Sequence, residues 1–344
     1  MRTLVTGATG FVGAHLARAL VDRGAAVRCL VRPSAPGGRR VNLLAELPVE
    51  IAPGDLREAA SLRDAVAGCD VVYHCAADYR LFTPDPSDTR DMFASNVTGT
   101  DNLLAACAEA GVGRVVYTSS VGALGLEPGG RPADERTPAS LDAMIGAYKR
   151  SKYQAERVAE SWAARGLPVV IVNPSTPVGE GDVKPTPTGQ MVVDFLRRKF
   201  PAYVDTGLNL VDVRDVAAGH LLAADRGRPG ERYILGHRNL TLKQILDALA
   251  RLTGLPSPRV RVPHWLPLAA AHVAGAASRL TGRPPRVTPE AVRMSRHRMF
   301  FDAGKAVREL GLPQSPIEPA LARAVDWFES HGYAPARRTG RRAA

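Results

Sequence analysis

The chain has 344 residues, of which 45% are hydrophobic and 23% are charged, and its formal net charge is +11. This composition supplies enough apolar surface for a packed core, so it excludes a chain that is disordered throughout. The glycines and prolines follow no collagen-like or low-complexity period. At ~100–200 residues per domain, the length predicts two domains or one large domain with an added lobe.

Short apolar runs alternate with helical patterns along the first half of the chain. Several of the runs are continuously apolar, which is typical of strands buried on both faces of a parallel sheet. The expected strands are TLVTG, AVRCLV, VEIAPGD, DVVYHCAA, RVVYTSS and PVVIVNPS, and the expected helices are 10–23, 62–67, 147–165 and one within DMFASNVTGTDNLLAACAEAG. The alternation predicts a doubly wound α/β fold of the Rossmann type.

This rhythm breaks after Pro174, where PSTPVGEGDVKPTPTG is predicted to be loop. One more strand and helix follow in NLVDVRDVAAGHLLAAD, then a short strand in RYILG, and from Leu240 onward helices dominate. We therefore expect a smaller, mostly helical substrate lobe intertwined with the first domain. The expected division is 1–178 for the dinucleotide-binding domain, with 205–236 returning to it, 179–204 and 237–334 for the lobe, and 335–344 for a basic disordered tail.

The charge and the cysteines suggest a cytoplasmic protein without nucleic acid or metal as a partner. The basic excess is mostly arginine, and no zinc-finger, helix-turn-helix or interleaved aromatic pattern accompanies it.

No apolar run reaches the ~18 residues that span a bilayer, and no leader pattern precedes the first strand. The stretch WLPLAAAHVAGAASRL is expected to form a lobe helix, with peripheral membrane contact as the alternative. The cysteines lack a CxxC pair and are expected to be buried reduced thiols: Cys29, Cys69, Cys75 and Cys107.

The segment TGATGFVG places Gly7, Gly10 and Gly13 in the first strand–helix turn. A dinucleotide site requires glycines there, because the turn is tight, the backbone approaches the pyrophosphate and the helix packs close to the sheet. Phe11 and Val12 begin the helix, whose free N–H groups and positive dipole end favour phosphate. The turn opens a series of strand–helix units, and it therefore predicts dinucleotide binding.

The end of the second strand selects between NAD and NADP. An acid there holds a ribose diol, whereas an arginine accommodates the 2′-phosphate of NADP. Arg32 stands at this place in LVRPS, and Arg39 and Arg40 follow in the next loop. The sequence therefore favours NADP over NAD, unless Arg32 is only a solvated loop residue. Asp55, after the third strand, is expected either to accept a hydrogen bond from the adenine or to cap the next helix.

Tyr148 and Lys152 stand four residues apart, so their side chains share one face of the expected helix. A neighbouring ammonium lowers a tyrosine pKa that starts near ~10, which makes the phenol usable as a general acid or base. The spacing alone is common in proteins and usually has no functional meaning. Ser119 and Ser120, however, follow the strand RVVYTSS at the sheet edge where ligands bind, and a serine there can hold the reacting oxygen of a substrate.

On these motifs the chain resembles the extended short-chain dehydrogenase/reductase family from Met1 to about Pro313. The resemblance implies an active enzyme with Ser120, Tyr148 and Lys152 as the catalytic triad. It also implies that Asn96, in NVTGTDNLL, supports a proton relay or the central helix, with a merely helix-bending residue as the alternative. The cofactor positions that follow from it, besides the glycine turn and Arg32, are Asp55, Leu56, Ala76, Tyr148, Lys152 and Pro174.

Within that family, three segments are most similar to hopanoid-associated sugar epimerases, and dihydroflavonol reductases are the next most similar group. Two departures bear on the mechanism. Val121 and Gly122 stand where sugar dehydratases resembling this fold carry an acid pair, so the sequence argues against a dehydratase. Leu208 replaces an arginine that grips the diphosphate in nucleotide-sugar epimerases, and SRHRMFFDAGKA lacks their second clamp, although Arg296 or Arg298 offers a substitute.

The sequence leaves three hypotheses. The first is an NAD(P)-dependent sugar epimerase associated with hopanoid lipid synthesis, and the second is an NADPH-dependent ketone or aldehyde reductase. The third, a non-catalytic NADP-sensing protein, is disfavoured by the intact triad. The resemblance also implies a homodimer through the helices that contain Asn96–Glu109 and Tyr148–Ala164, because both carry small apolar residues over much of their surface.

Overall fold

The fold was determined as a computed structural model, which describes residues 1–33, 42–80, 85–271 and 289–335. Three parts of the sequence-based interpretation lie outside these residues: Arg39 and Arg40, the C-terminal tail from residue 336, and residues 272–280 of the apolar stretch WLPLAAAHVAGAASRL. In the described part, no helix is both long and apolar enough to cross a membrane.

A seven-stranded sheet forms the larger part of the molecule. Every neighbouring pair of its strands is parallel, and the strand order is β3-β2-β1-β4-β5-β6-β9. The strands are β1 (Arg2–Thr6), β2 (Ala26–Val31), β3 (Glu50–Pro53), β4 (Val71–His74), β5 (Arg114–Thr118), β6 (Val169–Pro174) and β9 (Arg232–Leu235). The reversal of order on either side of β1 and β4 is the doubly wound topology that the alternating pattern predicted.

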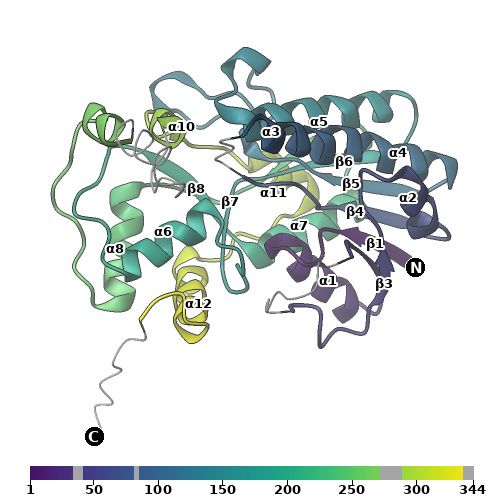
Figure 1. The fold of residues 1–344 in the computed structure, drawn as a ribbon, viewed down its shortest axis with the longest axis horizontal. Coiled ribbons are helices and arrows are strands. Elements are labelled where there is room, and N and C mark those ends of the chain that lie inside the picture. Colours follow the sequence, from purple (N-terminus) through teal and green to yellow (C-terminus); the bar gives the residue numbers. More distant parts are fainter. Residues whose placement is uncertain (34–41, 81–84, 272–288, 336–344) are drawn as a thin grey trace, which may run out of the picture.

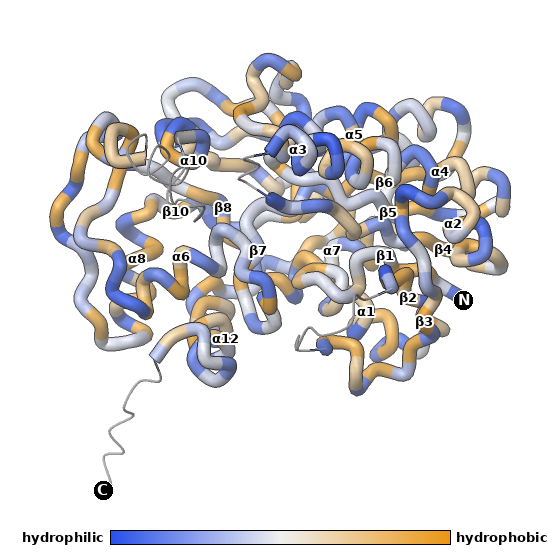
Figure 2. The backbone as a smooth tube through the Cα atoms, viewed as in Figure 1, coloured by the Kyte–Doolittle hydropathy of each residue, from blue (hydrophilic) through white to orange (hydrophobic). Residues whose placement is uncertain are grey.

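Helices cover both faces of this sheet and make it a three-layer structure (Figure 1). One face packs against α1 (Phe11–Asp22), α7 (Val213–Arg226) and α11 (Gly304–Leu310). The other packs against α2 (Ala59–Val66), α4 (Gly99–Glu109) and α5 (Gly146–Ala164). The apolar strands therefore lie between two hydrophobic layers. Figure 2 shows hydrophobic residues in orange alternating with hydrophilic ones in blue along the covering helices.

A second, smaller sheet and its helices form a lobe beside the main sheet (Figure 1). Its strands are β7 (Thr176–Val178), β8 (Gly207–Asp212), β10 (Arg238–Thr241) and β11 (Arg298–Met299), with β8 paired to all three others. The helices α6 (Pro187–Leu196), α8 (Leu242–Thr253) and α12 (Ile317–Ser330) share a core of their own. A short helix, α10 (Pro289–Met294), precedes β11.

Three local expectations differ from the structure. The segment after Pro174 contains β7, because its backbone pairs with β8, so it is not loop throughout. The segment 205–236 divides between the two sheets: β8 joins the small sheet, while β9 joins the large one. The expected single helix around Asn96 is three consecutive pieces, namely α3 (Pro86–Phe93), a π-helical turn (Ala94–Thr98) and α4.

Candidate active site

Four neighbouring strands of the main sheet end at one edge, where the predicted site residues lie. Because β1, β4, β5 and β6 are parallel, their carboxyl ends meet there. Gly7 follows β1, Ala76 follows β4, Ser120 follows β5, and Pro174 ends β6. The structure therefore brings together residues that are distant in sequence.

The turn after β1 leaves no room for side chains. Gly7 has a φ of +72°, and a Cβ on it would lie 2.6 Å from the backbone nitrogen of Ala76. A Cβ on Gly13 would lie 2.2 Å from the carbonyl oxygen of Gly7. Glycine is therefore required at both positions, because any side chain would push the turn away from α1 and β4.

The N-terminus of α1 is prepared for an anion. Its N-cap, Gly10, provides no side-chain hydrogen bond, and the first turn, from Phe11 through Val12 and Gly13, contains no acidic residue. The N–H groups at the start of a helix have no partner within the helix, and the helix dipole adds partial positive charge there. A close-packed glycine turn with open N–H groups fits the pyrophosphate of a nicotinamide dinucleotide.

Arg32 and Asp55 lie near each other at the rim of this turn. Arg32 is exposed directly after β2, and its charge helps to lower the pKa of Asp55. The largest cause of that lowered pKa is the side-chain hydrogen bond from Arg57, whose Nη2 donates to Asp55 Oδ2 at 2.8 Å. Asp55 does not cap the next helix, because the N-cap of α2 is Glu58. Its role toward adenine stays a prediction.

Ser120, Tyr148 and Lys152 meet at the carboxyl end of β5. Ser120 Oγ accepts a hydrogen bond from Gly122 N at 3.0 Å, so its own proton remains available to another acceptor. The Ser120 side chain is also close enough to Tyr148 to lower the pKa of its phenol. Lys152 Nζ donates to the carbonyl oxygen of Thr118 at 2.7 Å. This bond anchors the ammonium to the last residue of β5.

Burial shifts the pKa values of both titrating members in directions that favour their neutral forms. It raises the pKa of Tyr148 well above its ordinary value, and the Ser120 side chain lowers it only in part. Burial also lowers the pKa of Lys152 to about 8, against the field of Glu156, which raises it. The sequence predicts that the ammonium lowers the pKa of the tyrosine, but in this structure desolvation is the largest cause of the pKa shift for both groups.

Asn96 is held in the π-helical turn between α3 and α4. Its Oδ1 accepts from Asp78 N at 2.6 Å, and its Nδ2 donates to Asp78 O and to Ser151 Oγ, each at 3.0 Å. Ser151 Oγ in turn donates to the carbonyl oxygen of Tyr148 at 2.8 Å. The wide turn therefore points the asparagine at α5 and ties it to the backbone of the candidate acid/base residue.

Two residues beside the site, Glu156 and Tyr79, were not identified from the sequence. Glu156, on α5, is fully buried and accepts hydrogen bonds from Ser119 and Asn173. Tyr79 packs its ring edge-on against Tyr148, with ring centroids 4.3 Å apart. The signal for Glu156 was present, because an acidic residue one helical turn after Lys152 lies on the sheet-facing stripe of α5 and needs partners there.

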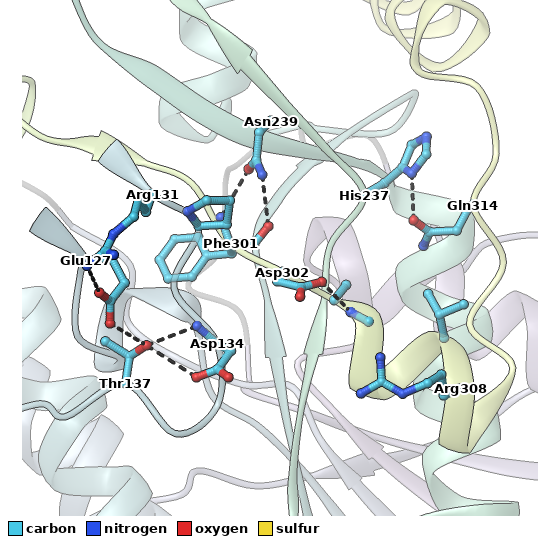
Figure 3. Close-up of a pocket in the computed structure, with 14 residues that line it drawn as sticks. Glu127, Arg131, Asp134, Thr137, His237, Asn239, Phe301, Asp302, Arg308 and Gln314 are labelled. Atoms are coloured by element: carbon cyan, nitrogen blue, oxygen red, sulfur yellow. Dashed lines mark hydrogen bonds and ion pairs between the residues drawn. The ribbon is translucent and has the colours of Figure 1, made fainter. Parts of the chain in front are cut away.

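A cavity of about 750 Å³ lies elsewhere, between the segment 127–137, β10 and the segment 301–314 (Figure 3). The side chains of Glu127 and Thr137 meet on one side of it, and those of His237 and Gln314 meet on another. None of the three residues of the triad lines it. This cavity is therefore distinct from the candidate active site.

The fold and the site together define a class: a nicotinamide-dinucleotide-dependent enzyme with a serine–tyrosine–lysine cluster at the sheet edge. A family model, the NAD dependent epimerase/dehydratase family, matches residues 3–236. The chain belongs to this family, whose structures have the same extended short-chain dehydrogenase/reductase architecture. It is an NAD(P)-dependent epimerase or oxidoreductase, and its cofactor is NAD or NADP.

The chain is similar to other proteins over nearly its whole length. It is 51% identical to the "Putative dihydroflavonol 4-reductase" of Synechocystis sp., covering 96% of this chain and 95% of that protein. It is 39% identical to sterol demethylase protein B of Methylococcus capsulatus, covering 96% of this chain and 99% of that protein. Among solved structures, a nucleoside-diphosphate-sugar epimerase from Pseudomonas aeruginosa is 30% identical, with a TM-score of 0.78 over 97% of this chain and 99% of that one.

Proposed function

We propose that the protein is an NADP-dependent oxidoreductase that reduces a carbonyl group on an apolar lipid-type substrate in hopanoid synthesis. The observation that carries this proposal is an intact Ser120–Tyr148–Lys152 cluster in a chain that lacks both diphosphate clamps. The names of the Synechocystis and Methylococcus relatives support it, since they describe a reductase and a protein of sterol demethylation. The link to hopanoids rests on the sequence resemblance.

The reduced cofactor, NADPH, would bind at the glycine turn and supply the hydride, and NADP⁺ would leave. Side chains of the protein would bind and protonate the carbonyl oxygen of the substrate. Ser120 Oγ–H would donate a hydrogen bond to the carbonyl and hold it next to Tyr148. Burial raises the pKa of Tyr148, so the phenol is protonated before the hydride arrives, and Tyr148 would then give its proton to the alkoxide that develops. Lys152, anchored on Thr118, would stabilise the phenolate that remains.

The lobe argues against a nucleoside diphosphate as the recognised group. Leu208 lies in β8 and packs its side chain against the lobe core, where a clamp arginine would otherwise stand. Arg298, one of the two substitutes considered, is paired with Asp205 at 2.9 Å. Arg296, the other, is exposed. A diphosphate would therefore have to rely on the exposed Arg296 or draw Arg298 away from an existing ion pair.

A sugar epimerase is the second candidate. It is favoured by the three sequence segments that resemble hopanoid-associated sugar epimerases, and by the similarity to the Pseudomonas structure. In such an enzyme Tyr148 would first remove a hydroxyl proton and later return it. The cofactor would be regenerated within each turnover and would stay bound to the protein.

Cofactor release and consumption distinguish the two candidates. We expect the purified protein to lose its dinucleotide on gel filtration, and to oxidise added NADPH in step with the loss of a cyclic ketone supplied in detergent. Ultraviolet absorbance follows the cofactor, and mass spectrometry follows the alcohol. A dinucleotide released only on denaturation, with no net NADPH consumption, would contradict the reductase and favour the epimerase.

We also propose a homodimer in the cytoplasm, formed by α4 and α5. Ala106, Ala155 and Ala159 cannot serve the interface, because they are buried within the single chain between these helices and the sheet. Ala105 and Ala108 remain accessible on α4. We expect light scattering to give twice the chain mass of 36.7 kDa.

Ala105→Arg should convert this dimer to a monomer, since a charged side chain at a two-fold contact meets its own copy. Arg63→Asp, on the exposed face of α2, serves as a control that should remain dimeric. A wild-type mass of one chain at all micromolar concentrations contradicts the dimer. A dimer that survives Ala105→Arg places the interface elsewhere.

A further inference from the structure

Glu156 is a buried carboxylate in α5, one helical turn after Lys152, and its side chain has no exposed surface. Burying a carboxylate is costly unless ion pairs and hydrogen bonds compensate for the lost water. Here the partners come from the ends of β5 and β6 and from the first residue of β9, which are adjacent in the sheet. One carboxylate therefore joins the helix of the triad to three neighbouring strands.

One oxygen of Glu156 fixes the serine turn. Oε2 accepts from Ser119 Oγ at 2.5 Å and from Asn173 Nδ2 at 2.7 Å. Asn173 Nδ2 also donates to the carbonyl oxygen of Ser120 at 3.1 Å. Glu156 thus holds Ser119 directly. It holds the carbonyl oxygen of Ser120 through the side-chain amide of Asn173.

The other oxygen faces two arginines. Oε1 accepts from Arg157 Nη2 at 3.1 Å and lies 3.2 Å from Arg232 Nη1. Both arginines also pair with Glu160, one turn further along α5 and partly exposed. Glu156 and Glu160 therefore share the same cations, but only Glu156 reaches the residues of the serine turn.

The surroundings of Lys152 contain other titratable groups, but they are neutral near pH 7. Burial lowers the pKa of His74 to about 3 and raises that of Cys75 to about 11. Burial also raises the pKa of Tyr117, whose ring centroid lies 5.1 Å from Lys152 Nζ. In the part of the chain that the structure describes, Glu156 is thus the acid whose negative charge acts on Lys152.

We propose that Glu156 is a positioning residue of the active site, which fixes the Ser119–Ser120 turn and keeps Lys152 in its cationic form. A buried negative charge at this place offsets the desolvation of the ammonium, so that the triad holds a positive charge at neutral pH. The relevance of this charge to turnover rests on the proposed function, whereas its effect on Lys152 is a property of the folded chain alone.

The direct test measures the titration of Lys152 in the cofactor-free protein. The chain has few lysines, so ¹³C labelling of lysine resolves them by NMR, and the spectrum of Lys152→Met assigns the signal. We expect the wild-type signal to titrate near pH 8. Glu156→Gln should lower the midpoint by about one pH unit or more, because an uncharged amide no longer favours the ammonium. Equal midpoints in the two proteins would overturn the proposal.

Two further variants separate charge from architecture. Glu160→Gln removes a carboxylate from the same pair of arginines without touching Ser119 or Asn173, and it should leave the Lys152 midpoint within a fraction of a unit. If Glu156→Gln does not fold, Arg232→Met tests the same electrostatic effect with the opposite sign. Removing that cation should raise the midpoint of Lys152, and an unchanged or lowered midpoint would contradict the proposal.

Activity supplies the second readout. In the direction of reduction, Glu156→Gln should lower kcat and move the alkaline limb of kcat/KM to lower pH, while Glu156→Asp, which keeps the charge, should restore the wild-type pH profile. A loss of rate without any shift of the profile would mean that Glu156 serves only the architecture. Absence of reductase activity in the wild type would contradict the proposed function, but the NMR titration would still decide the role of Glu156.

Discussion

Replacing Tyr148 by phenylalanine is expected to lower turnover by ~10²–10⁴-fold, the usual effect of removing one acid/base group. The ring would remain, so its edge-on packing with Tyr79 and the local fold should persist. The lost atom is the phenolic oxygen, which carries the proton and whose pKa Ser120 helps to lower. We therefore expect dinucleotide affinity, measured by fluorescence titration, to stay close to that of the wild type.

Tyr153→Phe is the matched control for this substitution. Tyr153 lies on the same helix, but its hydroxyl donates a long hydrogen bond of 3.4 Å to the carbonyl oxygen of Ala139. Turnover of this variant should remain near the wild-type value. Wild-type turnover in Tyr148→Phe would contradict the triad, and an equal loss in both variants would indicate a general effect on α5.

Arg32→Asp should reverse the preference between the two dinucleotides. The guanidinium offers a fork of donors to a 2′-phosphate, whereas a carboxylate repels that phosphate and accepts hydrogen bonds from a ribose diol. Hydrogen bonds to charged groups contribute ~1.5–3 kcal/mol, so we expect NADP affinity to fall roughly 10- to 100-fold and NAD affinity to rise. Titration of both cofactors against both proteins measures the change.

The position of Arg32 explains why a single substitution should suffice. Arg32 is exposed at the end of β2, close enough to Asp55 to influence its pKa, while Arg57 is already bonded to that carboxylate. Of the two arginines that the structure describes beside Asp55, Arg32 is thus the one that can turn toward a new anion. Arg63→Asp, on α2, carries the same change of charge and should alter neither affinity. Equal NADP affinities for wild type and Arg32→Asp would remove Arg32 from the site.

The main sheet and the core of the candidate site could be predicted from the amino-acid sequence, because those features depend largely on local patterns. The alternation of apolar runs with helical patterns predicted the doubly wound fold. Buried strands and amphipathic helices each require a characteristic spacing of apolar residues, and that spacing can be recognised in the sequence. The glycine at position 13 is required by contacts within the first strand–helix turn, while the one at position 7 also meets the backbone after β4. Tyr148 and Lys152 are placed by the helical repeat, which brings positions four apart onto one face.

Which residues support that site, and how the lobe is built, depend on contacts between segments that are distant in sequence. Glu156 meets its hydrogen-bond partners across separations of 17 and 37 residues, and no local pattern encodes which strand ends lie beside α5. The π-helical turn that holds Asn96 and the pairing of β7 with β8 also arise from contacts between distant segments. Burial, finally, sets the protonation of Tyr148 and Lys152, because desolvation depends on everything packed around a group rather than on its neighbours in sequence.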